Sequence, residues 1–215
     1  MQLVDLSWPI YPGMSKIPMA PDVEMRPLME LAKGDSSNIT LITMASHIGT
    51  HMDAPCHFIA GARSIDQMPL ETFTGPVVTV AINRGPVEEI PLEDIAEAGI
   101  EPGDIVFLHT GWAGKFGTPA YDHHPYLSED VAHFLVDKRV KMLGVDCVNV
   151  DMPIADRPPN HTRPVHHTLL GNDVLIIENL TNLEAIAGRK ARVFAFPLKY
   201  RGGDGAQTRV VAELA

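Results

Sequence analysis

The feature that most constrains the fold is a cluster of metal-binding residue types between Ser46 and Phe58. His47, His51, Asp53 and His57 all occupy odd-numbered positions, which share one face of an extended chain. A straight strand would separate the Cα atoms of His47 and His51 by about 13 Å. That is near the limit for two imidazoles that bind one ion at about 2.0–2.1 Å. The chain must therefore bend between these histidines if they are to form one metal site.

The residues between the histidines indicate how the chain bends. Gly49 lies where the bend is needed, since glycine adopts positive φ without strain. Thr50 and Pro55 disfavour a continuous helix. We therefore predict a strand that runs into a kinked loop ended by Pro55. Cys56 would face away from His57, which indicates packing rather than nucleophilic catalysis.

A second cluster lies more than a hundred residues downstream. Glu178 ends an apolar run, and ligands gather at the carboxyl ends of strands in α/β folds. A carboxylate there is costly unless it is paired or bound to a cation. His166 or His167 could join it in the metal site. Glu178 could also support the start of a following helix through the helix dipole, and the two roles are compatible.

Strand-like segments alternate with helix-like segments along the chain, which is typical of an α/β protein. Without repeats, low-complexity segments or linkers, residues 1–215 are predicted to form a single domain. The predicted strands are Ile39–Ala45 leading into the motif, Pro76–Ile82, Asp104–His109, Lys141–Val145, Val174–Glu178 and Ala191–Leu198.

Three helices have start or stop signals. Leu92–Ala98 follows Pro91 and precedes Gly99. Ser128 can cap a second helix. A capping box at Thr181–Glu184 begins the third, which Gly188 ends.

The first 27 residues are predicted to form an extended arm. Prolines recur from Trp8 to Pro27, which excludes an ordinary helix or central strand. The arm carries large apolar side chains, so we expect it to pack against its own domain or a neighbouring subunit.

Composition and net charge exclude some classes of binding partner. The net charge of −10 disfavours nucleic acid and anionic membranes, and no apolar run is long enough to span a bilayer. The N-terminus lacks the features of a signal peptide, and the two cysteines form no disulfide framework. We expect a cytoplasmic location. His109, His123, His124 and His133 have no second ligand nearby in sequence and are interpreted as structural or solvent-facing.

The motif His47-x-Gly49-Thr50-His51-x-Asp53-Ala54-Pro55-x-His57 resembles the signature of the cyclase superfamily, metal-dependent hydrolases that include bacterial kynurenine formamidase and isatin hydrolase. The resemblance extends along nearly the whole chain. It includes Asp5-Leu6-Ser7, Tyr11–Met14, Thr110-Gly111-Trp112, Gly144-Val145-Asp146, the segment from His166 to Leu183, and Gly205–Arg209.

The resemblance implies a swivelling β/β/α domain, Zn²⁺ or Mn²⁺ as cofactor, and a homodimer or homotetramer. By the same resemblance, His47, His51 and Asp53 hold a first metal. Asp53 bridges to a second metal held by His166 and Glu178, and His166 is favoured over His167. The resemblance makes His57 the catalytic acid or base; binding the metal is the alternative role.

Similar kynurenine formamidases carry a Trp-Pro-Gly-Asp run in the arm, whose tryptophan stacks on the aryl substrate. The corresponding residues here, Ile17–Asp22, include no aromatic side chain, which weakens the case for N-formylkynurenine itself. Aromatic groups near the mouth of the site are the candidate substrate contacts: Phe58, Trp112, and Trp8 or Tyr11 from the arm, with a core role equally open for Trp112.

These residues predict a hydrolase in which water activated by the metal attacks a small amide, formamide or lactam. His57 would move the proton, since an imidazole titrates near neutral pH. Two alternatives stay open: a metal-stabilised oligomeric binding protein without turnover, and a metal-dependent cyclase or lyase that uses the same site.

Overall fold

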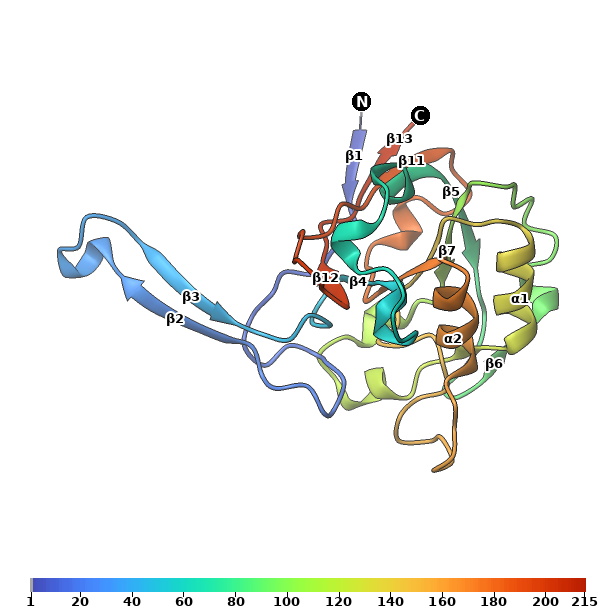
Figure 1. Ribbon diagram of the computed structural model, residues 1–215, viewed down its shortest axis with the longest axis horizontal. Coiled ribbons are helices and arrows are strands. Elements are labelled where there is room, and N and C mark those ends of the chain that lie inside the picture. The colour runs from blue at the N-terminus through green and yellow to red at the C-terminus, as the bar shows by residue number, and fades with distance from the viewer. Residues whose placement is uncertain (1) are drawn as a thin grey trace.

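A computed structural model describes residues 2–215, and a curled nine-stranded sheet forms its centre (Figure 1). The strand order is β1-β13-β11-β5-β7-β9-β10-β4-β12. These strands are β1 Gln2–Asp5, β4 His51–Asp53, β5 Thr74–Ala81, β7 Ile105–His109, β9 Met142–Val145, β10 Leu175–Glu178, β11 Ala191–Phe194, β12 Gly205–Gln207 and β13 Val211–Leu214.

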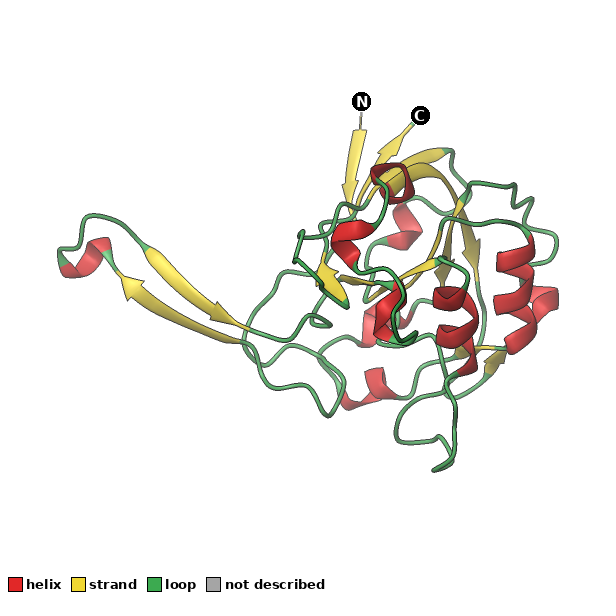
Figure 2. Ribbon diagram, viewed as in Figure 1, coloured by secondary structure: helices red, strands yellow, loops and turns green. Residues whose placement is uncertain are grey.

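Strands β5, β7, β9 and β10 are parallel neighbours, and the pairs toward both edges of the sheet are antiparallel. Helices α1 (Glu129–Asp137) and α2 (Pro164–Gly171) cover one face (Figure 2). Val131 and Leu169 pack there, whereas Phe107 and Ile177 belong to the core on the other face. Apart from His109 and Glu178 at their ends, the central strands β7, β9 and β10 are apolar because both of their faces are buried. The predicted α/β class is confirmed.

One of the three predicted helices forms as an α-helix. In α1, the Ser128 side chain accepts a hydrogen bond from the amide of Val131, as its capping role requires. The segments at 92–98 and 181–188 form only single 3₁₀ turns, and no capping box forms at 181–184. Both of these predictions of a longer helix are wrong, because the following residues turn toward Gly99 and Gly188 at positive φ after one turn. The 3₁₀ turns are Leu31–Lys33, Pro55–His57, Ile65–Gln67, Leu70–Phe73, Leu92–Asp94, Trp112–Lys115, Pro119–Asp122 and Leu183–Ala185.

A long β-hairpin projects from the body (Figure 1). Its strands, β2 Glu24–Met29 and β3 Ile39–Thr43, pair only with each other. The prediction that a strand at 39–45 leads directly into the motif is wrong, because β3 ends at Thr43 and residues 44–50 turn back toward the sheet. A second small pair joins β6 (Glu89–Ile90) to β8 (Tyr126–Leu127).

The segment predicted as an extended arm contributes to several parts of the molecule. Its start, β1, is an edge strand paired with β13. Met14 and Val23 are buried against Ile48, beside the metal-binding motif. Pro27 lies in β2 next to a register shift, which suits a residue that has no amide hydrogen to donate.

None of the helices within residues 2–215 combines the length and apolar character needed to cross a membrane.

Candidate metal centre

The register between β4 and β10 brings the two sequence clusters together. His51 pairs with Glu178, and Asp53 pairs with Ile176, so His51, Asp53 and Glu178 share one face of the sheet. His51 Nε2 lies 3.4 Å from Asp53 Oδ1 and 3.5 Å from Glu178 Oε2. Strand alternation thus places three ligand-type side chains around one point.

His47 reaches the same point from the turn before β4. Gly49, at φ +64°, makes the bend that the sequence predicted. His47 Nδ1 then lies 2.7 Å from Asp53 Oδ1. Gly205 on the neighbouring β12 leaves room for this ring, because a Cβ atom there would lie 2.7 Å from His47 Cε1.

His57 lies at the open edge of the cluster. Pro55 begins a 3₁₀ turn that ends at His57, so the prediction that Pro55 ends a loop is wrong: its fixed φ starts a helical turn instead. The His57 ring stacks on His47 with centroids 3.9 Å apart. Its Nδ1 lies 3.9 Å from Asp204 Oδ2, and the same Asp204 oxygen is 3.3 Å from His47 Nε2.

Helix α2 supplies the last imidazole. His166 Nε2 lies 3.5 Å from Asp53 Oδ2 and 3.4 Å from Glu178 Oε1. His167 is exposed on the same helix and faces the edge of Phe58 instead. Of the two adjacent histidines, the structure brings only His166 to the cluster.

Helix α2 and two acidic residues beside the cluster, Asp151 and Asp204, were not predicted from the sequence. Pro164 at the first position of α2 was the available signal for the helix. Asp151 and Asp204 lie in irregular segments and carry no motif, so only the fold reveals their positions.

The ligand atoms form two groups that share Asp53. His47, Asp53 and His57 offer atoms within 4.8 Å of one another, and so do His51, Asp53 and Glu178. His57 therefore has the geometry for a ligand as well as for an acid or base. Asp53 thus contributes an atom to each of the two groups of potential ligands.

The burial of these groups explains why the cluster favours a cation. Asp53 and Glu178 are almost fully buried, and uncompensated buried carboxylates are costly. Glu178 Oε1 and the Nε2 atoms of His47 and His51 are buried without a hydrogen-bond partner among the described residues. Imidazole nitrogens and carboxylate oxygens that converge and lack partners fit a divalent ion such as Zn²⁺ or Mn²⁺.

The pKa shifts in the metal-free protein separate the two stacked histidines. Burial alone would lower the pKa of His47, but attraction and a hydrogen bond to Asp53, with Asp204 and Glu178 nearby, raise it to about 9. Burial lowers the pKa of His57 to about 4, against the attraction of Asp53. Burial also raises the pKa of Glu178. His57 is thus the neutral imidazole of the stacked pair.

Three of the candidate substrate contacts lie in different surroundings. Phe58 stacks on His166 with centroids 4.5 Å apart and meets His57 edge-on. Trp112 is buried in the core, and its Nε1 donates to the carbonyl of Tyr121, so the alternative of a core role accounts for it. With only 3% of its surface exposed, its contact with a substrate stays a prediction. Trp8 stacks on Phe116 and lines a hollow that contains none of the clustered ligands.

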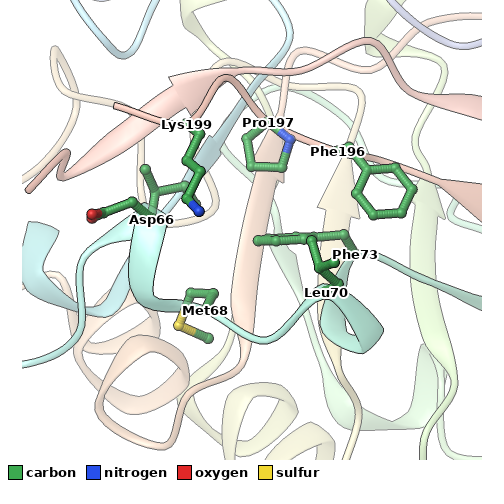
Figure 3. Close-up of a pocket in the computed structure, with 8 residues that line it drawn as sticks. Asp66, Met68, Leu70, Phe73, Phe196, Pro197 and Lys199 are labelled. Atoms are coloured by element: carbon green, nitrogen blue, oxygen red, sulfur yellow. The ribbon is translucent and has the colours of Figure 1, made fainter. Parts of the chain in front are cut away.

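A separate apolar cavity of about 170 Å³ is lined by residues from two segments, 65–73 and 196–199 (Figure 3). Phe73, Phe196 and Leu70 line it, with Asp66 and Lys199 at its edge. Asp66 accepts hydrogen bonds from Ser64 and from the amide of Gly202, and the second bond holds the loop that leads to Asp204. The cavity contains none of the clustered metal-ligand residues.

Comparison with known proteins identifies the family. Residues 4–152 match the Cyclase family, described as "Putative cyclase". The chain is 30% identical to kynurenine formamidase from Salinibacter ruber, covering 98% of this chain and 97% of the relative. It is 27% identical to kynurenine formamidase from Bacillus anthracis, covering 97% and 95%. Isatin hydrolase A from Labrenzia aggregata, solved with benzyl benzoate, is similar in structure, with a TM-score of 0.88, 27% identity and coverage of 98% and 93%.

The fold and the cluster together define a metal-dependent hydrolase that acts on carbon–nitrogen bonds other than peptide bonds. The chain belongs to the cyclase family. The sequence resemblance to this family is thereby confirmed.

Proposed function

We propose that this protein hydrolyses a small amide, formamide or lactam at the cluster between β4, β10 and α2. The observation that supports this most strongly is the convergence of ligand-type side chains from three distant segments around buried carboxylates. The similarity to kynurenine formamidases and to an isatin hydrolase favours an arylformamide or a cyclic aryl amide as the substrate class.

One or two ions of Zn²⁺ or Mn²⁺ are held in this proposal by His47, His51, Asp53, His166 and Glu178, with Asp53 shared. A divalent ion bound there supplies Lewis acidity and lowers the pKa of water to about 7. Each imidazole ligand binds in its neutral form, so binding displaces the proton that the raised pKa of His47 favours in the metal-free protein.

His57 is the proposed general acid and base. Its Nδ1 faces Asp204, which leaves Nε2 to accept a proton from water and return it to the leaving nitrogen. Burial lowers its pKa to about 4 in the metal-free protein, so the imidazole carries no proton at neutral pH. Its side chain is 28% exposed, so a substrate arriving from solvent can reach it.

Phe58 is the proposed apolar contact for the substrate. Its ring packs between His57 and His166 and is half-buried, so it can cover the reacting carbonyl and exclude water. The guanidinium of Arg163 lies over the Phe58 ring, 5.4 Å from its centroid. Trp8 lines a different hollow, which contains none of the clustered metal-ligand residues, so we expect it to contribute less to substrate binding than Phe58.

A substrate panel tests this function. N-formyl aryl amines, cyclic aryl amides and aryl esters are incubated with protein loaded with Zn²⁺ or Mn²⁺, and hydrolysis is followed by absorbance. Turnover of a formamide or lactam that falls sharply in His57→Ala, with metal content unchanged, supports the proposal. Tight metal binding without turnover would favour a binding protein, and a product formed without uptake of water would favour a cyclase or lyase.

We also propose that the protein is a homodimer or homotetramer whose β2–β3 hairpin packs on a second copy. The hairpin leaves the body and pairs with no other strand (Figure 1). Such an exposed apolar strand pair is marginal in water by itself. Its exposed large side chains are Met25, Leu28, Leu31, Ile39, Leu41 and Ile42.

The subunit number is measurable by light scattering on the eluting protein. Wild type is expected at two or four subunits, and Leu28→Asp combined with Ile42→Asp is expected to shift it to monomer. The matched control is Leu3→Asp, because Leu3 is also an exposed apolar residue and lies on β1 at the edge of the sheet. A wild-type monomer would overturn this assembly.

A further inference from the structure

Asp151 lies beside the metal cluster without facing the ligand point. It is buried in the segment between β9 and α2, and its Oδ2 lies 2.5 Å from His166 Nδ1. The opposite nitrogen of that ring, Nε2, faces Asp53 and Glu178. The imidazole of His166 is therefore held between one carboxylate behind it and two in front.

The same carboxylate also stabilises the start of α2. The amides of Val165 and His166 donate to its two oxygens at 3.1 and 3.2 Å. Arg163, at the N-cap position, is left-handed and its side chain makes no capping bond, so Asp151 satisfies these amides from fourteen and fifteen residues away. Any test must separate this structural role from an effect on His166.

The two buried imidazoles of the cluster are oriented in different ways. His51 Nδ1 lies 2.8 Å from the carbonyl of Gly49, a neutral acceptor. His166 Nδ1 faces a carboxylate. A carboxylate accepts only, so the neutral ring that binds a metal must carry its proton on Nδ1 and its lone pair on Nε2. Carboxylate partners of this kind fix the tautomer of a metal-binding histidine and increase its basicity.

We propose that Asp151 is a positioning residue that fixes the tautomer and ring orientation of His166, so that Nε2 presents its lone pair to the ion. This inference depends on the proposed metal site and goes beyond its ligands. It also predicts an asymmetric centre, in which the position served by His166 depends on a charged partner and the position served by His51 does not.

The test is Asp151→Asn. The single oxygen of asparagine can still accept from the amide of Val165, so α2 keeps one of its two bonds to residue 151 and the metal-free variant should melt only slightly below wild type. Its NH₂ group instead donates to His166 Nδ1, which moves the ring proton to Nε2 and blocks metal binding there. Zn²⁺ affinity, measured by competition with a chromophoric chelator, should fall by about 10–100-fold.

The matched control is Asp156→Asn. Asp156 Oδ2 accepts from His123 Nδ1 at 2.8 Å, which is the same kind of pair five residues along, away from the cluster. This variant should keep the wild-type affinity for Zn²⁺. An Asp151→Asn affinity equal to that of wild type and control would overturn the proposal.

A double-mutant cycle distinguishes positioning from general destabilisation. In a His166→Ala background, Asp151→Asn should cause no further loss of Zn²⁺ affinity. An equal loss in both backgrounds would overturn the proposal. If Asp151→Asn does not fold, Asp151→Ser replaces it in the same cycle, since a serine hydroxyl can still cap amides but brings no carboxylate to His166. Failure of wild type to hydrolyse any amide would leave these affinities unchanged, and so would bear only on the proposed function.

Discussion

The metal cluster has a closed half and an open half. The closed half consists of His51, Asp53, His166 and Glu178, which are nearly inaccessible and lie between paired strands and α2. The open half consists of His47, His57 and Asp204, whose side chains are 13%, 28% and 50% exposed. Fixed, dehydrated ligands suit the holding of an ion, while an accessible neutral imidazole suits proton transfer to a substrate that comes and goes. We therefore expect substitutions in the two halves to cause different losses of metal binding and of hydrolytic rate.

The largest loss is expected from the closed half. Asp53→Asn removes the carboxylate shared by both ligand groups and should abolish stoichiometric metal binding. Amide hydrolysis should fall by at least about 10³-fold, because the chemistry of the ion is lost with it. Metal analysis of the purified variant, together with initial rates, checks this. A variant that keeps its full metal content would contradict the shared role of Asp53.

A smaller loss, with metal retained, is expected from the open half. His57→Gln keeps a polar side chain but cannot take up a proton, and removal of a general acid–base group costs about 10²–10⁴-fold in rate. Metal content and kcat measured on one preparation separate the two roles. Loss of the metal would instead assign His57 to the ligands, as its closeness to His47 and Asp53 allows.

Gly205→Ala tests the boundary between the halves. The added Cβ would meet His47 Cε1 at 2.7 Å and the carbonyl of Met52 at 2.8 Å, so the ring must move from Asp53. We expect about a 10-fold loss of metal affinity, as for other shifts in the support of a metal ligand. Gly114→Ala, where nothing lies within 4 Å of the added atom, should leave affinity unchanged. Equal affinities in the two variants would show that His47 is free to relocate.

The smallest effect on the protein at neutral pH is expected from a buried histidine outside both halves, which acts on the stability of the fold. His124 lacks a carboxylate partner, and burial lowers its pKa to about 4. The unfolded chain, with a pKa near 6.5, binds more protons between these values, so stability rises with pH across that window and is lost as pH falls from 6.5 toward 4. The full effect is about 3 kcal/mol.

Denaturant unfolding of wild type and His124→Gln between pH 4 and 7 measures this term. The variant should show a smaller pH slope in the free energy of unfolding than wild type. An unchanged slope would mean that His124 contributes nothing to it.

The sequence predicted the cluster better than its surroundings. The two-residue spacing from His51 to Asp53 predicts that they share a face, and Gly49 predicts the bend before them; both features appear in the fold. The approach of Glu178 to His51 depends on strand pairing between distant segments, for which only the general preference for strand ends gave a signal. Asp151 could not be predicted from local patterns, because its contact with His166 depends on how the loop before α2 packs against that helix.

The errors have local physical causes. The segments at 92–98 and 181–188 have helix-like ends, but each leaves helical geometry after a single 3₁₀ turn and then reaches a glycine at positive φ. The strand at 39–43 was found, but its projection into a separate hairpin depends on tertiary structure that the pattern does not contain.

Metal removal and return measures the central claim most directly. Protein stripped with a chelator and dialysed should hydrolyse none of the amides or lactams that the untreated protein accepts. Activity should return in proportion to added Zn²⁺ or Mn²⁺ and saturate at one or two ions per subunit. Full activity in protein shown to be free of metal would contradict the account.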